Sequence, residues 1–142
     1  MQKPRASRWF SFTISTLCVA QAIYIYMTAP ASPEPTEIIS VIPVNSTGAI
    51  YEVLYNSGGA TVPIVYRYFL MKRDDNHTEA LNKIKSAHPF LVTKSSGAVR
   101  EILPGRVKLR TLDMIYEYRN TAYYETNGEW KRVKLDLTSD MP

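Results

Sequence analysis

The chain of 142 residues has very little cysteine and histidine. It holds one cysteine, Cys18, and two histidines, His77 and His88. A single thiol permits no intrachain disulfide and no cysteine-ligated metal site. Asp74 and Asp75 lie near His77, but no further carboxylates are spaced to complete a metal site with them. The sequence therefore predicts that the protein binds no metal.

Familiar catalytic motifs are absent from the sequence as well. It contains no G-x-S-x-G nucleophile elbow, and the segment NSGG, residues 56–59, lacks the lysine of a P-loop. A turn between two strands also presents no helix N-terminus to a phosphate. We therefore expect a protein that is not an enzyme and that binds no small-molecule cofactor.

Acidic residues are missing from the first part of the chain. Lys3, Arg5 and Arg8 precede the first carboxylate, Glu34, and the formal net charge of the whole chain is +4. Beyond these three residues, the other 14 of the 17 Lys and Arg face all 13 Asp and Glu. The folded part is therefore close to neutral, which argues against nucleic acid as a partner.

Charge is also absent from Trp9 to Ala29, where the side chains are mostly apolar. A helix of this length spans about 31 Å, close to the thickness of a hydrocarbon core. Trp9 at one end and Tyr24 and Tyr26 near the other suit the two membrane interfaces. The positive-inside rule then places residues 1–8 in the cytoplasm. We predict a single transmembrane signal anchor in the inner membrane, with the rest of the chain in the periplasm.

A cleaved signal peptide is the alternative. The segment APA, residues 29–31, matches the small-residue pattern that signal peptidase prefers, and cleavage there gives a mature chain starting at Ser32. Pro30 within this segment and Pro33 after it argue against cleavage, as does an apolar run longer than the usual h-region. The retained anchor is therefore the favoured interpretation.

Residues 30–47 are predicted to form a proline-rich linker. Pro30, Pro33, Pro35 and Pro43 favour extended geometry and oppose a helix. The apolar stretch Ile38 to Val44 is harder to leave in water. It is expected to lie along the following domain or to form an edge strand, where proline is tolerated.

Residues 48–142 are predicted to form an α+β domain, an antiparallel β-meander of six to eight strands with one inserted helix. Period-two alternation and turn signals recur through it, the strongest being Asn127–Gly128. The stretch from Val62 to Met71 is apolar on both faces, so we expect this strand to be covered on both sides. A helix is predicted from Asn76 to His88, with Pro89 ending it. Its apolar face comprises Ala80, Leu81, Ile84 and Ala87.

Tyrosine is abundant, with ten in the chain, and two groups lie beside arginine in the segments YRY and YEYR. Tyrosine and arginine are favoured at protein interfaces, although tyrosine also suits an ordinary sheet. The predicted interaction residues are Tyr66, Arg67, Tyr68, Tyr116, Tyr118 and Arg119. The strand glutamates Glu52, Glu101, Glu117 and Glu125 are expected to be solvent-facing charges that pair with neighbouring Arg or Lys.

The layout as a whole comprises a basic start, one apolar helix, a proline spacer and a small cysteine-free β domain. It resembles small inner-membrane proteins of Gram-negative bacteria that carry periplasmic domains, among them immunity proteins and envelope accessory factors. That resemblance implies a protein partner in the envelope. The alternative is an assembly subunit that acts through its transmembrane helix, in which Thr16 and Ala20 have small-xxx-small spacing.

Overall fold

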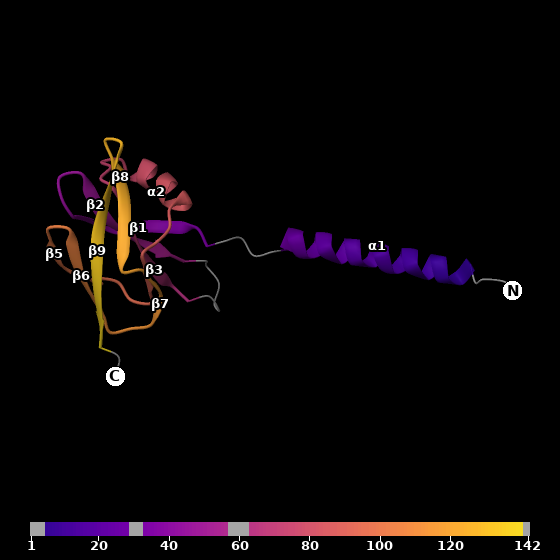
Figure 1. Cartoon of the computed structure of the whole chain (residues 1–142). Helices are drawn as coiled ribbons and strands as arrows, with labels where there is room; N and C mark the ends of the chain where they lie inside the picture. The colour runs from indigo at the N-terminus through magenta and orange to yellow at the C-terminus, as the bar shows by residue number, and fades with distance from the viewer. Residues whose placement is uncertain (1–4, 29–32, 57–62, 141–142) are drawn as a thin grey trace. The chain divides into compact units, whose positions relative to one another are not determined.

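The computed structural model describes residues 5–28, 33–56 and 63–140. The chain divides into two compact units, residues 1–32 and residues 33–142 (Figure 1).

The first unit contains a single helix, α1, Arg5–Thr28. Its segment Trp9–Thr28 is long and apolar enough to cross a membrane, and it is the one such helix in the described part of the chain. The hydroxyls of Thr13 and Thr16 each donate to a carbonyl oxygen one turn earlier, both at 2.9 Å, so these polar groups are satisfied within the helix. Length and composition suit a membrane anchor and a signal sequence alike.

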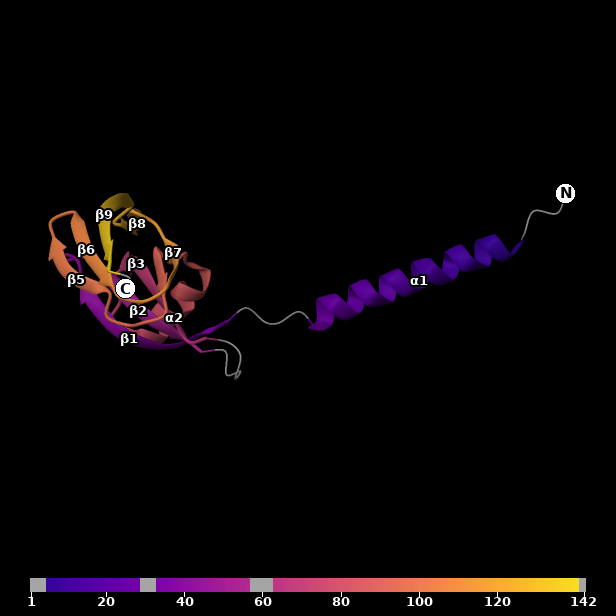
Figure 2. The ribbon, with the colours of Figure 1, turned by 90° about the horizontal axis from the view of Figure 1, so that it is seen from below.

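The second unit is an α+β domain with nine strands and one helix in its described residues (Figures 1 and 2), which confirms the predicted fold class. Sheet A has the order β1-β2-β3-β4-β7, and sheet B has the order β5-β6-β9-β8. The strands of sheet A are β1 Pro35–Pro43, β2 Gly48–Tyr55, β3 Val65–Lys72, β4 Leu91–Thr93 and β7 Ile115–Tyr118. The strands of sheet B are β5 Val99–Leu103, β6 Arg106–Thr111, β8 Thr121–Thr126 and β9 Glu129–Ser139.

One pairing departs from a simple meander, because β6 and β9 run parallel. After β6 the chain leaves sheet B and adds β7 to the edge of sheet A. It then returns through the β8–β9 hairpin, whose second strand fills the place beside β6. Because the chain passes through sheet A between β6 and β8, β9 runs parallel to β6. The alternation of residues within single strands does not predict this direction.

Strand β1 lies inside the segment predicted as a linker. It pairs with β2 at the edge of sheet A, which confirms the edge strand expected around Ile38 to Val44. The prediction of a linker over residues 30–47 is therefore too long, because the second compact unit begins at Pro33. The physical reason is apolar contact, since Ile38 and Ile42 pack against the two hydrophobic clusters of the domain.

Two hydrophobic clusters cover the two faces of sheet A. The inner cluster lies between the sheets and includes Ile50 and Tyr68 of sheet A with Leu109 and Leu135 of sheet B. The outer cluster joins sheet A to α2, His77–Ser86, the helix predicted after β3. Strand β3 contributes to both clusters, as its sequence predicts. The helix presents Ala80 and Ile84 to the outer cluster, and the Asn76 side chain caps it by accepting from the Thr78 amide.

The turn between β8 and β9 has the predicted geometry. Asn127 has a φ of 52° and Gly128 a φ of 76°, and the flanking residues Thr126 and Glu129 are paired. Positive φ at both central residues is characteristic of a type I′ hairpin. The turn predicted at Asn56–Gly59 falls largely outside the described residues.

Candidate functional site

The six predicted interaction residues do not form one surface. Tyr68 has an exposed fraction of 0 %, and Tyr66 is half-buried against the inner cluster. The prediction that Tyr68 contacts a partner is therefore wrong. Successive residues of β3 point to opposite faces, and both faces of sheet A are covered near Tyr68, so neither tyrosine of the YRY segment is presented freely to solvent.

The Tyr68 hydroxyl belongs to a buried polar network around Glu52. Tyr68 donates to Glu52 Oε1 at 3.0 Å, and the hydroxyl accepts from the Ala98 amide at 3.1 Å. Glu52 also accepts from the Ser40 hydroxyl at 2.9 Å and from the Gly97 amide at 2.8 Å. Burial raises the pKa of the Tyr68 phenol well above its ordinary value, so the hydroxyl stays a donor.

Glu52 itself contradicts the expectation of a solvent-facing strand glutamate, because its exposed fraction is 3 %. Three donors from β1, β3 and the loop before β5 satisfy its carboxylate. No lysine or arginine within the described ranges forms an ion pair with it. A carboxylate whose acceptor sites are occupied by fixed donors holds the loop to the sheet and has little capacity left for a substrate.

Arg67 lies on the opposite face of β3. Its guanidinium carbon stands 4.2 Å from the centroid of the Tyr55 ring, a cation–π contact, and its Nε is buried without a hydrogen-bond partner. Arg67 pairs in register with Val92 of β4, which pairs with Glu117 of β7. These three residues therefore form one row across the outer face of sheet A.

A β-bulge brings Tyr116 to the same face. The register shifts between the Val92–Glu117 and Thr93–Ile115 pairs, leaving Tyr116 as the extra residue of β7. Tyr116 consequently lines a pocket with Glu117 and is 47 % exposed. Tyr118 reaches toward sheet B, where its hydroxyl donates to the Leu135 carbonyl at 2.5 Å.

The resulting pocket, called the Arg67 pocket below, has a volume of about 520 Å³. It is lined by Arg67, Lys85, Ser86, Ala87, His88, Pro89, Val92, Tyr116 and Glu117. The C-terminal end of α2 and the residues after it form one side, and sheet A forms the floor. Arg119 adjoins it through an ion pair with Glu117, at 3.0 Å from Nη2 to Oε1. That pair confirms the expected neutralisation of Glu117.

Arg67 and Tyr116 are thus the two predicted residues that the fold brings into one pocket. Sequence reasoning missed Lys85 and His88, which come from the end of α2. The available signal was the segment SAHP, residues 86–89. Its proline ends the helix, and the residues at the end of a helix that covers a sheet lie close to that sheet. The bulge in β7 left no such signal, because the isoleucine and tyrosines of IYEY suit a regular strand.

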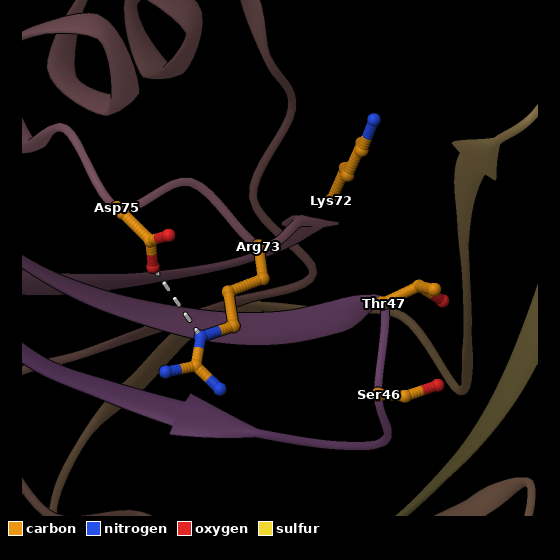
Figure 3. Close-up of a pocket in the computed structure, with 5 residues that line it drawn as sticks. All are labelled: Ser46, Thr47, Lys72, Arg73 and Asp75. Atoms are coloured by element: carbon orange, nitrogen blue, oxygen red, sulfur yellow. Dashed lines mark ion pairs between the residues drawn. The ribbon is translucent and has the colours of Figure 1, made fainter.

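A second pocket, of about 350 Å³, is lined by Ser46, Thr47, Lys72, Arg73 and Asp75 (Figure 3). Its side chains do not converge on a common point. Arg73 turns toward Asp75, with 3.9 Å between Nε and Oδ1, whereas Lys72 points away from both. Such a divergent set offers no defined binding geometry.

Within the described residues, no three His, Cys, Asp or Glu side chains come close enough to hold a metal ion. The residues that line the Arg67 pocket offer recognition by charge, hydrogen bonds and an aromatic ring. No protein-family model, curated protein or solved structure matches the chain.

Proposed function

We propose that the protein is a single-pass inner-membrane protein whose periplasmic domain binds a protein partner through the Arg67 pocket and catalyses no reaction. In this proposal α1 is a retained anchor with its N-terminus in the cytoplasm. The protein acts as an immunity or envelope accessory factor.

The observation that carries the proposal is the state of Arg67. Its guanidinium stacks on Tyr55, while its buried Nε has no hydrogen-bond partner. Because that Nε is buried, a partner contacts Arg67 through the other atoms of the side chain, those that line the pocket. The side chain is also held by packing, so a ligand meets it with little further loss of conformational entropy.

The chemistry of the pocket favours an acidic side chain carried on a protein surface. Arg67 and His88 supply donors, Lys85 shares its charge with Glu34 at 3.7 Å, and the nearby carboxylate of Glu117 is already paired with Arg119. Tyr116 provides an exposed ring that packs against apolar atoms of a partner. Arginine and tyrosine in such a setting are typical hot-spot residues.

The test is capture of a partner from detergent-solubilised envelope by the full-length protein. Tyr116→Ala is expected to weaken capture by about 2 kcal/mol, a typical hot-spot cost. Arg67→Lys keeps the charge but loses the planar fork and is expected to weaken capture as well. Leu112→Ala is the control, because Leu112 is 61 % exposed and does not line the pocket. Equal capture by wild type and both pocket variants would contradict the proposal.

The orientation has its own test. Alkaline phosphatase fused after Pro142 is expected to be active, because the enzyme folds only outside the cytoplasm. A cytoplasmic reporter that works at the same position would contradict it. A mature chain that starts at Ser32 would establish the cleaved form.

An assembly role for α1 is the second candidate. The small-xxx-small pair Thr16 and Ala20 lies on this helix, and the Thr16 hydroxyl is satisfied by the Phe12 carbonyl. The pair therefore offers close helix contact more than an interhelical hydrogen bond. Replacing α1 with an unrelated transmembrane helix separates the two roles, since partner capture through the Arg67 pocket survives the exchange and assembly through α1 does not.

A further inference from the structure

The outer face of sheet B has a composition that the proposed function does not use. Strand β6 alternates between buried Val107 and Leu109 and exposed Arg106, Lys108 and Arg110. Its basic side chains point away from the inner cluster. Unlike the outer face of sheet A, this face has no apolar cluster over it in the described residues.

Three cations gather at one end of this face. Arg106 pairs in register with Lys134, and Lys134 pairs with Thr121 on its other side. A pocket of about 570 Å³ is lined by these residues together with Pro104, Gly105 and Arg132. Arg106 and Lys134 share a single carboxylate, Asp136, at 3.3 and 3.9 Å. Arg132 forms no ion pair within the described ranges, so the pocket keeps an excess of positive charge.

Two exposed aromatic residues adjoin these cations along the β8–β9 hairpin. Tyr123 pairs in register with Arg132 and is 56 % exposed. Trp130, 70 % exposed, has the same side-chain parity as Arg132 and pairs with Glu125. Elsewhere on the face, Lys108 and Arg110 are neutralised by Glu101 and Asp140, so the excess of positive charge lies near Arg132, with the carboxylate of Glu125 on the same face beside Trp130. The set Arg106, Tyr123, Trp130, Arg132 and Lys134 is called the basic aromatic face below.

We infer that the basic aromatic face docks on the anionic phospholipid headgroups of the bilayer that holds α1. Guanidinium and ammonium groups bind phosphate oxygens, and each basic residue near an anionic bilayer contributes to attraction. Tyrosine and tryptophan rings favour the headgroup level, where a ring has both apolar and polar surroundings. Cations and amphipathic rings on one exposed face are the combination that such an interface requires.

The anchor gives this contact a high local concentration of lipid, and in this respect the inference rests on the proposed function. The chain runs from Thr28, the end of α1, to Pro35, the start of β1, and spans at most about 25 Å even when fully extended. The domain therefore stays near the headgroups. Weak individual contacts are then sufficient, because docking is intramolecular.

Trp130 provides a direct optical probe. The chain has two tryptophans, so a Trp9→Phe background leaves Trp130 as the single one. The full-length protein is reconstituted in vesicles of phosphatidylcholine, with or without phosphatidylglycerol. We expect a blue-shifted Trp130 emission, quenched by brominated lipid, in the anionic vesicles only. High salt is expected to reverse both signals.

Charge-reversal variants test which basic residues contact the lipid headgroups. The double variant Arg132→Glu/Lys134→Glu is expected to lower the docked fraction at least about tenfold, since four unit charges change beside an anionic surface. Arg132→Glu alone and Lys131→Glu form the matched pair of single charge reversals, because Lys131 lies on the opposite side of β9. Arg132→Glu is expected to weaken docking, and Lys131→Glu is expected to dock like wild type. Circular dichroism of each variant reports that the domain remains folded.

Each other outcome overturns the inference. Equal quenching in neutral and anionic vesicles would show docking without charge recognition. Complete reversal by millimolar inorganic phosphate at constant ionic strength would identify a soluble phosphate site, and loss of the signal in Lys131→Glu would show only a general charge effect. Flotation with neutral vesicles tests the anchor separately, so failure of the anchor and failure of the basic aromatic face are distinguishable.

Discussion

The outer faces of the two sheets differ in what covers them. On the outer face of sheet A an apolar cluster packs against α2, with Val53 and Phe69 of the sheet and Ile84 of the helix almost fully buried. In sheet B the outer face carries Arg106, Lys108 and other charged side chains. Both sheets share the inner cluster, so the difference lies entirely on their outer sides.

The difference shows how a strand's pattern reports its surroundings. In β3 the neighbours Tyr68 and Phe69 are both buried, one in each cluster. In β6 the neighbours Lys108 and Leu109 differ, because only Leu109 faces a cluster. A strand covered on both faces carries apolar residues on both of them, whereas a strand covered on one face alternates.

The largest expected effect comes from breaking the outer face of sheet A. Phe69→Ala removes a side chain that is 1 % exposed and is expected to lower the free energy of unfolding by about 3–5 kcal/mol. Lys108→Ala, on the outer face of sheet B, is expected to change it by less than about 0.5 kcal/mol. Urea unfolding of residues 33–142 measures both.

The two variants together make the comparison falsifiable. Similar small losses for both would show that α2 covers sheet A only loosely. Similar large losses would show that sheet B is also covered, either by a second molecule or by a part of the chain beyond the described residues.

A smaller loss is expected from the buried polar network around Glu52 of sheet A. Glu52→Gln replaces one acceptor oxygen with an amide donor, facing the fixed donors of Ser40, Tyr68 and Gly97. The Ser40 hydroxyl can turn and accept from this amide, while the carbonyl oxygen keeps the bonds from Tyr68 and Gly97, so the expected loss is about 1 kcal/mol. Urea unfolding measures the loss, with Glu101→Gln as a control on the exposed side of sheet B. An unchanged midpoint for Glu52→Gln would show that the carboxylate is not needed.

Glu52 also marks a limit of sequence reasoning. Its neighbours in AIYEVLY are apolar, and an isolated glutamate in such a strand usually faces solvent. Its burial depends on donors from three distant places in the sequence, Ser40, Tyr68 and the Gly97 amide. Periodicity within one strand contains no information about donors brought by other segments.

The local features, in contrast, were readable. The two-faced strand β3, the cap at Asn76 and the turn at Asn127–Gly128 follow from short-range chemistry, and each is confirmed. The parallel β6–β9 pair and the bulge at Tyr116 depend on tertiary arrangement. For the Arg67 pocket, the sequence therefore identified Arg67 and Tyr116 as candidates but misassigned Tyr68 and did not reveal the contribution of α2.

A moderate effect is expected at the exposed tip of the β8–β9 hairpin. Gly128 has a φ of 76°, and an added Cβ would meet no atom within 4 Å. Gly128→Val therefore introduces backbone strain without a clash, at a cost of about 1–2 kcal/mol. Gly128→Asn is the control, because asparagine tolerates this conformation and should lose much less. Equal losses for Val and Asn, measured by urea unfolding, would show that positive φ is not the cause.

The smallest effect is expected from the exposed ion pair beside α2. Asp74 accepts from Lys83 Nζ at 2.6 Å and from the Asn76 amide, and these bonds hold the pKa of Asp74 below its ordinary value. A carboxyl group whose pKa is lower in the folded state stabilises the fold at pH values above its ordinary, unfolded-state pKa. This stabilisation is lost as the pH falls through the lower pKa of the folded state. Asp74→Asn is therefore expected to make the loss of stability below about pH 4 slightly less steep. Asp75→Asn, whose side chain is 98 % exposed, serves as the control.

Solvent screens the pair of Asp74 and Lys83, so the packing of α2 on sheet A should depend far more on Phe69 and Ile84 than on this contact. An Asp74→Asn loss at neutral pH as large as that of Phe69→Ala would reverse this ranking and show that α2 is held to sheet A mainly by charge.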